Sequence, residues 1–227
     1  MNTMSIIAIS VGTIPFSILL YNILNGNLSL QNIKFSKKKK NTYKRRSRKG
    51  EKGEGNISKQ LELLDSAQYK VYNNLLFRLK DDVTIQIDHI VVSTKGVFVI
   101  ETKNYGGIVK QLTSDVWKQI WYKYEYEFYS PIKQNESHIK SLMYVLFTKN
   151  RYWFKSVVVF PDNTSLQVYN NTPAVHCKHL CQEIEKHQKT ILTNSEVAEI
   201  CKKIEARNIY SKKNIKTHHK RVDKLYD

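Results

Sequence analysis

Two consecutive strand-like segments constrain the fold of this chain more than any other feature. The segment TIQIDHIVVS, at Thr84–Ser93, alternates and then becomes continuously apolar, and GVFVIETK, at Gly96–Lys103, is rich in β-branched and aromatic residues. The link between them is short and ends in glycine, so the two segments are predicted to form a β-hairpin. Strands this apolar must be covered by other parts of the chain.

The remaining segments predict helices interspersed with strands. A helix is expected at Glu54–Leu64, where apolar residues recur at helical spacing. The aromatic-rich segment Trp117–Tyr129 predicts one or two strands, and Gln134 to about Lys149 predicts an amphipathic helix. A short buried strand at Ser156–Phe160 and a late helix at Ser195–Ala206 follow. This order indicates an α/β fold in which a mixed β-sheet is flanked by helices.

Positive charge is concentrated in one short segment. The 227 residues contain 37 Lys and Arg against 20 Asp and Glu, a formal net charge of +17. Eleven of the basic residues and one acidic residue, Glu51, fall within residues 34–52, which leaves a net charge of only +7 for residues 53–227. Residues 1–33 carry no charged side chain. The overall basicity therefore does not by itself describe a protein that coats DNA.

The uncharged stretch Ile6–Leu24 is long enough to cross a membrane. As a helix it would span roughly 28 Å, close to the hydrocarbon thickness of a bilayer. A cleaved signal peptide, the main alternative, calls for a positive segment before the apolar run and a small-residue cleavage site after it, and neither is evident. A buried helix is a third interpretation. We expect a retained, single-pass transmembrane helix in the cell membrane, and the basic segment behind it places the following domain in the cytoplasm.

These shifts in composition divide the chain into four parts. Residues 1–33 form the membrane anchor, 34–52 a basic juxtamembrane linker, 53–165 the folded domain, and 166–227 a C-terminal helical extension with a basic tail. The linker is too charged to fold alone, and it either binds anionic lipid headgroups or concentrates nucleic acid near the domain. The tail at Lys212–Asp227 is expected to be solvated and frayed.

The predicted hairpin brings together residues that can carry chemistry. Glu101 and Lys103 alternate on one strand, so their side chains project from the same face, roughly 6.5–7 Å apart. Asp88 lies on the preceding strand, within reach of Glu101. Two carboxylates can hold a hard cation such as Mg²⁺, and a nearby lysine can steer water or stabilise a phosphodiester transition state. The alternative is an ordinary surface ion pair, but carboxylates beside buried strands require a partner or a metal.

Five separated sequence blocks, taken in order, resemble a known family. They are Gly53-Glu54, QIDHIVV at 86–92, GVFVIETKNYGG at 96–107, Trp117, and Pro131-x-x-Gln134-x-x-x-His138. Over about residues 50–160 the chain resembles the nuclease-related domain (NERD), a family similar to the PD-(D/E)XK nucleases. The resemblance implies a restriction-endonuclease-like core, and a membrane anchor with a basic neck is a common arrangement in this family.

The resemblance also implies a role for each matching residue. Asp88 and Glu101 would be ligands of Mg²⁺ or Mn²⁺, and Lys103 would be the catalytic lysine. Glu54, on the first helix, would be an accessory acid that positions a ligand or a second metal. Gln134 matches the family's glutamine near the active centre.

Other side chains are candidates for contact with nucleic acid. An aromatic and basic run interleaves stacking platforms with positive charge, although a strand pair with one buried aromatic face has the same pattern. His138 lies one helical turn after Gln134 and could face the same cleft. The candidates are Trp117, Lys118, Trp121, Lys123 and His138.

The remaining histidines and cysteines have simpler interpretations. Two histidines and two cysteines between His176 and Cys181 suggest zinc, but structural zinc sites draw ligands from two separated pairs, so buried thiols are the default. His89 is expected on the opposite sheet face from Asp88, as a core residue. The three cysteines include no CxxC pair, which favours a reducing compartment.

Two hypotheses from different classes follow. The first is a membrane-tethered, metal-dependent nuclease, and the second is a non-catalytic module on the same fold that binds nucleic acid or protein. The complete set of acids and lysine favours the nuclease, while the modest charge of residues 53–227 favours binding. Nucleic acid is the expected partner, DNA rather than RNA.

Overall fold

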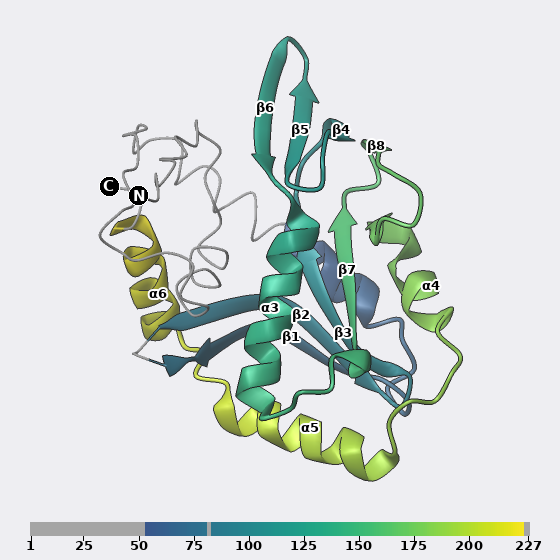
Figure 1. Ribbon diagram of the computed structural model, residues 1–227, viewed down its shortest axis with the longest axis vertical. Coiled ribbons are helices and arrows are strands. Elements are labelled where there is room, and N and C mark those ends of the chain that lie inside the picture. Colours follow the sequence, from purple (N-terminus) through teal and green to yellow (C-terminus); the bar gives the residue numbers. More distant parts are fainter. Residues whose placement is uncertain (1–52, 81–82, 225–227) are drawn as a thin grey trace, which may run out of the picture.

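The computed structural model describes residues 53–80 and 83–224 (Figure 1). The expected membrane span and basic linker lie outside these residues. Across the two described ranges, no helix is both long enough and apolar enough to cross a bilayer.

A five-stranded mixed sheet forms the centre of the fold, in the order β1-β2-β3-β7-β9. The first three strands are antiparallel neighbours: β1 (Lys70–Arg78), β2 (Thr84–Ser93) and β3 (Gly96–Thr102). The remaining two extend the sheet in parallel: β7 (Phe154–Phe160) and β9 (Ala174–His176). The predicted hairpin is therefore confirmed, with its turn closed by Ser93 opposite Gly96.

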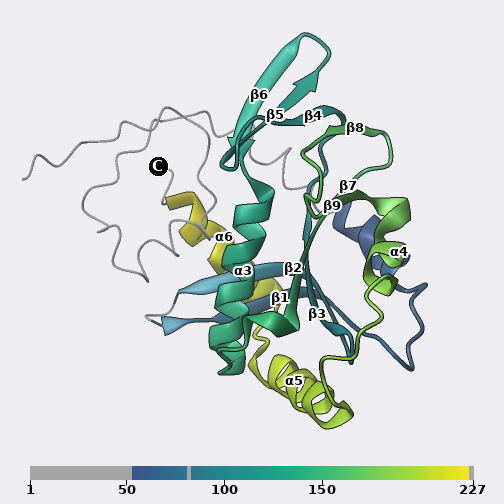
Figure 2. The same ribbon diagram turned by 45° about the vertical axis from the view of Figure 1, so that its right-hand side comes forward.

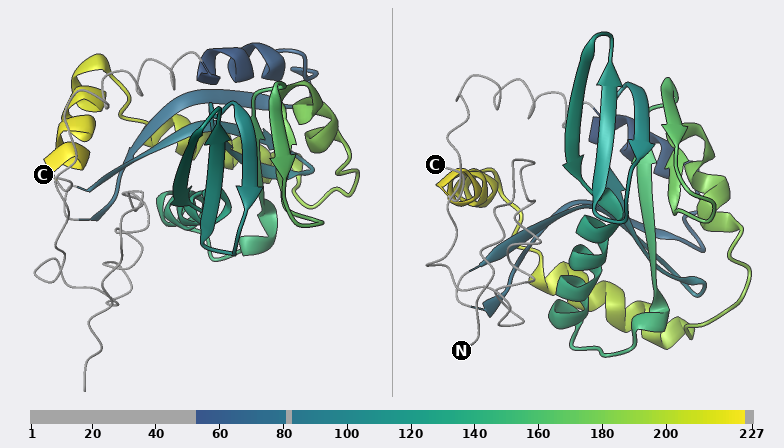
Figure 3. Two further views of the ribbon diagram at one scale, coloured as in Figure 1. Left: turned by 90° about the horizontal axis from the view of Figure 1, so that it is seen from above. Right: turned by 45° about the horizontal axis from the view of Figure 1, so that its top comes forward.

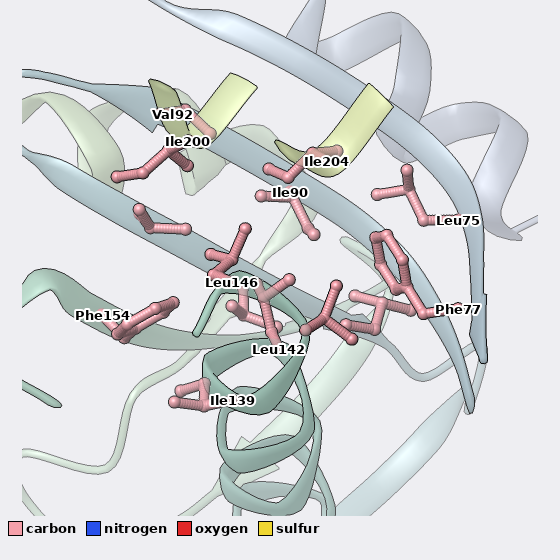
Figure 4. Packing of buried hydrophobic residues seen from close by; sticks show 14 of the residues in the cluster. Leu75, Phe77, Ile90, Val92, Ile139, Leu142, Leu146, Phe154, Ile200 and Ile204 are labelled. Carbon is pink, nitrogen blue, oxygen red and sulfur yellow. The ribbon is translucent and has the colours of Figure 1, made fainter. Parts of the chain in front are cut away.

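Helices cover both faces of this sheet (Figure 2). One face carries α3 (Pro131–Leu146) and α5 (Asn194–Arg207), and the other carries a helix at residues 53–61 and α4 (Leu180–Glu185). Apolar side chains of α3 and α5 meet those of β1 and β2 in one continuous cluster (Figure 4). Short 3₁₀ helices connect some of these elements, among them η3 (Arg151–Trp153) and η4 (Cys177–His179). The expected mixed sheet flanked by helices is present.

A second, four-stranded sheet extends from the first (Figure 3). Its order is β6-β5-β4-β8, and its strands are β4 (Gly107–Gln111), β5 (Val116–Trp121), β6 (Tyr124–Tyr129) and β8 (Thr164–Gln167). The aromatic segment thus forms two strands, and Trp117 joins the two sheets because its indole stacks on Phe160 of β7 at 6.0 Å. The outer hairpin β5–β6 projects from the body of the molecule (Figure 1).

The C-terminal region packs onto the same sheet. Ile200 and Ile204 of α5 are buried against the core, and α5 begins with a capping box between Thr193 and Glu196. The tail expected to fray instead forms α6 (Lys212–Lys224), which lies beside the outer end of β2. This correction follows from long-range packing, because residues 84 and 86 supply polar partners that the sequence of the tail does not reveal.

Strands β1 and β2 are both distorted where Asn74 faces Asp88. Asn74 has a positive φ of 52°, in the left-handed region that asparagine tolerates. On β1, Tyr72 and Leu75 pack into the same cluster, and on β2 Ile87 and Ile90 do so, although a regular strand would send each pair to opposite faces. On both strands, the alternation between the two faces of the sheet therefore shifts by one residue at the level of Asp88.

Candidate active site

Asp88 and Glu101 face each other across the hairpin. The register pairs His89 with Ile100, so Asp88 and Glu101 are the next opposed positions. No ladder pair forms there; instead, the backbone N–H of Thr102 donates to Oδ2 of Asp88 at 2.8 Å. The expected approach of the two carboxylates is thus fixed by a hydrogen bond between their strands.

Lys103 connects Glu101 to the helix above the sheet. Its Nζ lies 2.6 Å from Oε1 of Glu101 and 2.8 Å from Oε1 of Gln134 on α3. Gln134 reaches this position because α3 begins at Pro131, with Ser130 as its N-cap. The three residues therefore form a chain of contacts between β3 and the first turn of α3.

His138 also contacts Glu101, from the next turn of α3. Its Nδ1 lies 3.2 Å from Oε2 of Glu101, and the side chain is 6% exposed. The two atoms are in contact, but neither Nδ1 of His138 nor Oε2 of Glu101 has a hydrogen-bond partner. His138 thus lies against the carboxylate rather than on an open surface.

The electrostatic environments of the two carboxylates differ. Burial together with the charges of Glu101 and Glu54 raises the pKa of Asp88 well above its ordinary value. Burial also opposes ionisation of Glu101, but the charge of Lys103 and the contact with His138 outweigh it and lower its pKa to about 2. Glu101 is therefore a compensated anion, whereas Asp88 lacks enough positive charge nearby.

Lys103 remains charged in this environment. Burial alone would lower its pKa, but the negative charge of Glu101 raises it above the ordinary value. A buried lysine held as an ammonium is suited to stabilising negative charge rather than to accepting a proton.

The oxygen donors suit a hard divalent cation. In the described ranges, no group of three or more His, Cys, Asp or Glu side chains stands ready to hold a metal. The pair Asp88 and Glu101 nevertheless fits Mg²⁺, which retains several waters and needs only one or two carboxylates. The orphaned Oε2 of Glu101 and the uncompensated charge around Asp88 are the observations that support this fit.

A cavity of about 310 Å³ adjoins Lys103. Its walls come from the start of the helix at residues 53–61, from the end of β3 and the loop after it, and from the segment after β7. Thr102, Lys103 and Asn104 line it directly. Space for a substrate group therefore exists beside the lysine.

His89 lies in the core, as the sequence predicts. It is fully buried, its Nδ1 lies 2.7 Å from Oδ1 of Asn73, and its Nε2 has no partner. Burial lowers its pKa to about 4, so the ring stays neutral at physiological pH.

The sequence did not indicate the contribution of Asn135, which is fully buried and donates from Nδ2 to the carbonyl of Val99 at 2.7 Å.

The candidate nucleic-acid contacts separate into buried and exposed groups. Trp117 is fully buried against Phe160, because this part of strand β5 packs into the core. Its ring therefore cannot act as a stacking platform in this conformation. Lys118 forms an ion pair with Glu125 at 2.9 Å. Trp121 is 37% exposed near the tip of β5, and Lys123 lies over the ring of Tyr124.

The segment from His176 to Cys181 does not gather its side chains around one point. His176 contacts the carbonyl of Thr164, His179 lies beside Gln182, and the thiol of Cys181 donates to the carbonyl of Gln60. All three cysteines are free thiols. These contacts agree with the expectation of partly buried thiols.

Comparisons with known proteins agree with the sequence blocks. The family model described as nuclease-related domain, NERD, matches residues 49–161. A Bacillus anthracis protein described as uncharacterized protein pXO1-01 is 34% identical over 181 residues, and the match covers 76% of this chain and 82% of that relative. No solved structure matches. The matched block includes the candidate site residues Glu54, Asp88, Glu101, Lys103, Gln134 and His138.

Proposed function

Because the chain belongs to the nuclease-related domain family, we propose that it is a metal-dependent nuclease that hydrolyses phosphodiester bonds in nucleic acid. The observation that carries the proposal is the position of Lys103, which contacts Glu101 and Gln134 beside the carboxylate of Asp88, whose pKa is raised. This arrangement combines oxygen donors for a cation with a fixed positive charge. DNA is the proposed substrate, with RNA as the alternative.

In this proposal, Asp88 and Glu101 hold Mg²⁺ or Mn²⁺, which when bound would neutralise phosphate charge and lower the pKa of a water molecule. Lys103 directs its ammonium at the scissile phosphate and stabilises the negative charge that develops there. Gln134 keeps that ammonium in place, and His138 holds the orientation of the Glu101 carboxylate. Glu54 acts as an accessory acid, since its charge already reaches Asp88.

We further propose that the enzyme is tethered to the cytoplasmic face of the cell membrane by residues 6–24, with residues 34–52 against the lipid headgroups. The sequence pattern supports this, and a C-terminal reporter fusion tests it. A reporter that functions only in the cytoplasm should be active and remain in the membrane fraction. Activity of a reporter that functions only outside the cytoplasm would contradict the topology.

The second candidate function is a module that binds nucleic acid or protein without cleaving it. Glu101 favours this alternative, because the carboxylate is already engaged by Lys103 and His138 and would have to share its oxygens with a metal. A binding module would retain nucleic acid with or without divalent ions.

The deciding experiment uses the full-length protein in detergent with plasmid DNA, single-stranded DNA and RNA, each with Mg²⁺ or with a chelator. Cleavage should require the metal and should be lost in Lys103→Met. Lys149→Met, a change at an exposed lysine far from the site, is the matched control and should cut normally. If the wild-type protein neither binds a divalent ion nor cuts any of the three substrates, the binding module replaces the enzyme.

A further inference from the structure

The helix α6 has two different faces. Its inner face contacts the sheet through His218, whose Nδ1 lies 2.8 Å from Oγ1 of Thr84, and through His219, whose Nε2 lies 3.3 Å from Oε1 of Gln86. Its outer face is exposed and basic, with side chains at successive turns: Lys212, Lys213, Lys216, Lys220 and Arg221. From Lys212 to Val222 the helix contains no acidic residue.

This basic face lies beside the candidate active site. Gln86, which α6 contacts, precedes Asp88 by two positions on β2, so the helix axis lies on the order of 15 Å from the carboxylate. In Figure 1, α6 lies on the same side of α3 as the outer ends of β1 and β2, away from α4.

We propose that the outer face of α6 binds the phosphate backbone of the nucleic acid whose scissile bond enters the site, an inference that rests on the proposed function. Charge complementarity carries it. Four lysines at one face of a helix docked on β2 form a positive surface on the order of 15 Å from Asp88, within reach of a strand bound at the site. The contacts involve ammonium groups and phosphates alone, so binding is independent of base sequence.

Anionic lipid is the other polyanion that such a face could meet, but the position of α6 favours nucleic acid. The helix is docked by polar contacts to the strand that carries Asp88, and it lies outside the matched family block, which ends at residue 161. It therefore adds to this chain a basic surface whose orientation is set by the active-site strand.

The test replaces Lys212, Lys213, Lys216 and Lys220 together by glutamine in the full-length protein, which removes charge while keeping helix propensity. The matched control replaces four exposed lysines outside α6: Lys178, Lys186, Lys189 and Lys202. Binding to a short fluorescein-labelled DNA duplex is measured by anisotropy in a chelator, so that cleavage plays no part. The α6 set should weaken binding at least about tenfold and reduce the slope of log affinity against log salt by about three to four, whereas the control set should change neither.

Two further measurements keep the result interpretable. Replacing the same four α6 lysines by arginine should retain binding, which separates loss of charge from loss of fold. Backbone amides of α6 should gain protection from hydrogen exchange when the duplex is added. If the α6 and control sets behave alike, or if anionic vesicles protect α6 while DNA does not, the inference is wrong even if the protein proves to be a nuclease. If α6 governs binding but nothing is cut, the nuclease function fails and the binding surface stands.

Discussion

The Nζ atom of Lys103, the residue directly after β3, lies 2.8 Å from Oε1 of Gln134 on α3. The amide oxygen of Gln134 accepts a hydrogen bond from the ammonium of Lys103, which also forms an ion pair with Glu101. The packing of α3 on the sheet therefore determines where the charge of the lysine lies. The contact makes Gln134 a positioning residue whose effect acts through Lys103.

We expect Gln134→Leu to lower kcat by about tenfold to a hundredfold with little change in KM, because the lysine loses its orientation. The free energy of unfolding should fall by only about 1–2 kcal/mol, since Glu101 still pairs with the lysine. Steady-state cleavage and thermal melting measure the two effects. Tyr144→Leu, at an exposed position on the same helix, is the control, and normal turnover in Gln134→Leu would contradict the positioning role.

The two carboxylates should respond to neutralisation with opposite signs. The raised pKa of Asp88 means that its ionised form costs folding free energy, and this cost grows as the pH rises above about 4. Asp88→Asn should therefore stabilise the metal-free protein at pH 7 by about 1 kcal/mol, while an amide oxygen still accepts from Thr102. It should also abolish any rise in melting temperature caused by Mg²⁺.

Glu101→Gln should instead destabilise the protein by about 3 kcal/mol at pH 7, because it leaves the buried ammonium of Lys103 without its anion. The lowered pKa of Glu101 gives a stabilising contribution that is complete above about pH 4.5 and is lost as the pH falls toward 2. Urea titrations of both variants across pH 4 to 8 measure the signs. Equal effects would show that the two environments are alike.

Sequence periodicity predicted the part of the site that depends on one strand. A period of two places Glu101 and Lys103 on one face, and a short link ending in Gly96 brings Asp88 alongside. These relations are local, so the chain order determines them. The structure agrees with them at 2.6 Å for the ion pair and through the hydrogen bond of Thr102.

The rest of the site depends on contacts between distant segments. Nothing in the sequence near Asn74 shows that it takes a positive φ opposite Asp88, because that conformation is set by both strands together. Asn135 and α6 were missed for the same reason: their partners, Val99 and Thr84, lie 36 and 134 residues away. Alternation also could not say which half of the aromatic hairpin is buried, and Trp117 proved to be in the core.

Acid should loosen α6 through His218. Burial, with the positive charges of His219 and Arg221 on α6 and His138 on α3, lowers its pKa from 6.5 to about 4. The neutral ring favours the folded state, so its contribution is complete above pH 6.5 and is lost as the pH falls toward 4, by at most about 3 kcal/mol. His218→Gln should flatten this part of the pH profile of the melting temperature, whereas His179→Gln, at an exposed site, should leave it unchanged.

The outer half of the β5–β6 hairpin offers an aromatic face next to residues 103–106, the loop after β3 that contains Lys103. Trp121 opposes Tyr124 and Gln119 opposes Tyr126, so these side chains share one face. The indole of Trp121 packs so closely on Gly106 that a Cβ at this glycine would lie 2.5 Å from the ring. Gly106 is only three residues after Lys103, so the contact holds the indole close to the candidate site. The carboxylates of Glu125 and Glu127 lie on the other face, where both approach Lys118.

This arrangement predicts stacking of unpaired bases. Trp121→Ala combined with Tyr124→Ala should weaken binding of single-stranded DNA by about tenfold or more, since each stacked base contributes about 1–3 kcal/mol, and should weaken duplex binding much less. Anisotropy titrations with both DNA forms, in a chelator, provide the comparison. Tyr144→Ala removes an equally exposed ring from α3 and should affect neither form. Because Trp121 also packs on Gly106, the double variant should lower the melting temperature modestly, so binding is measured well below that temperature. Equal losses for both DNA forms, or no loss, would show that the exposed rings do not contact bases.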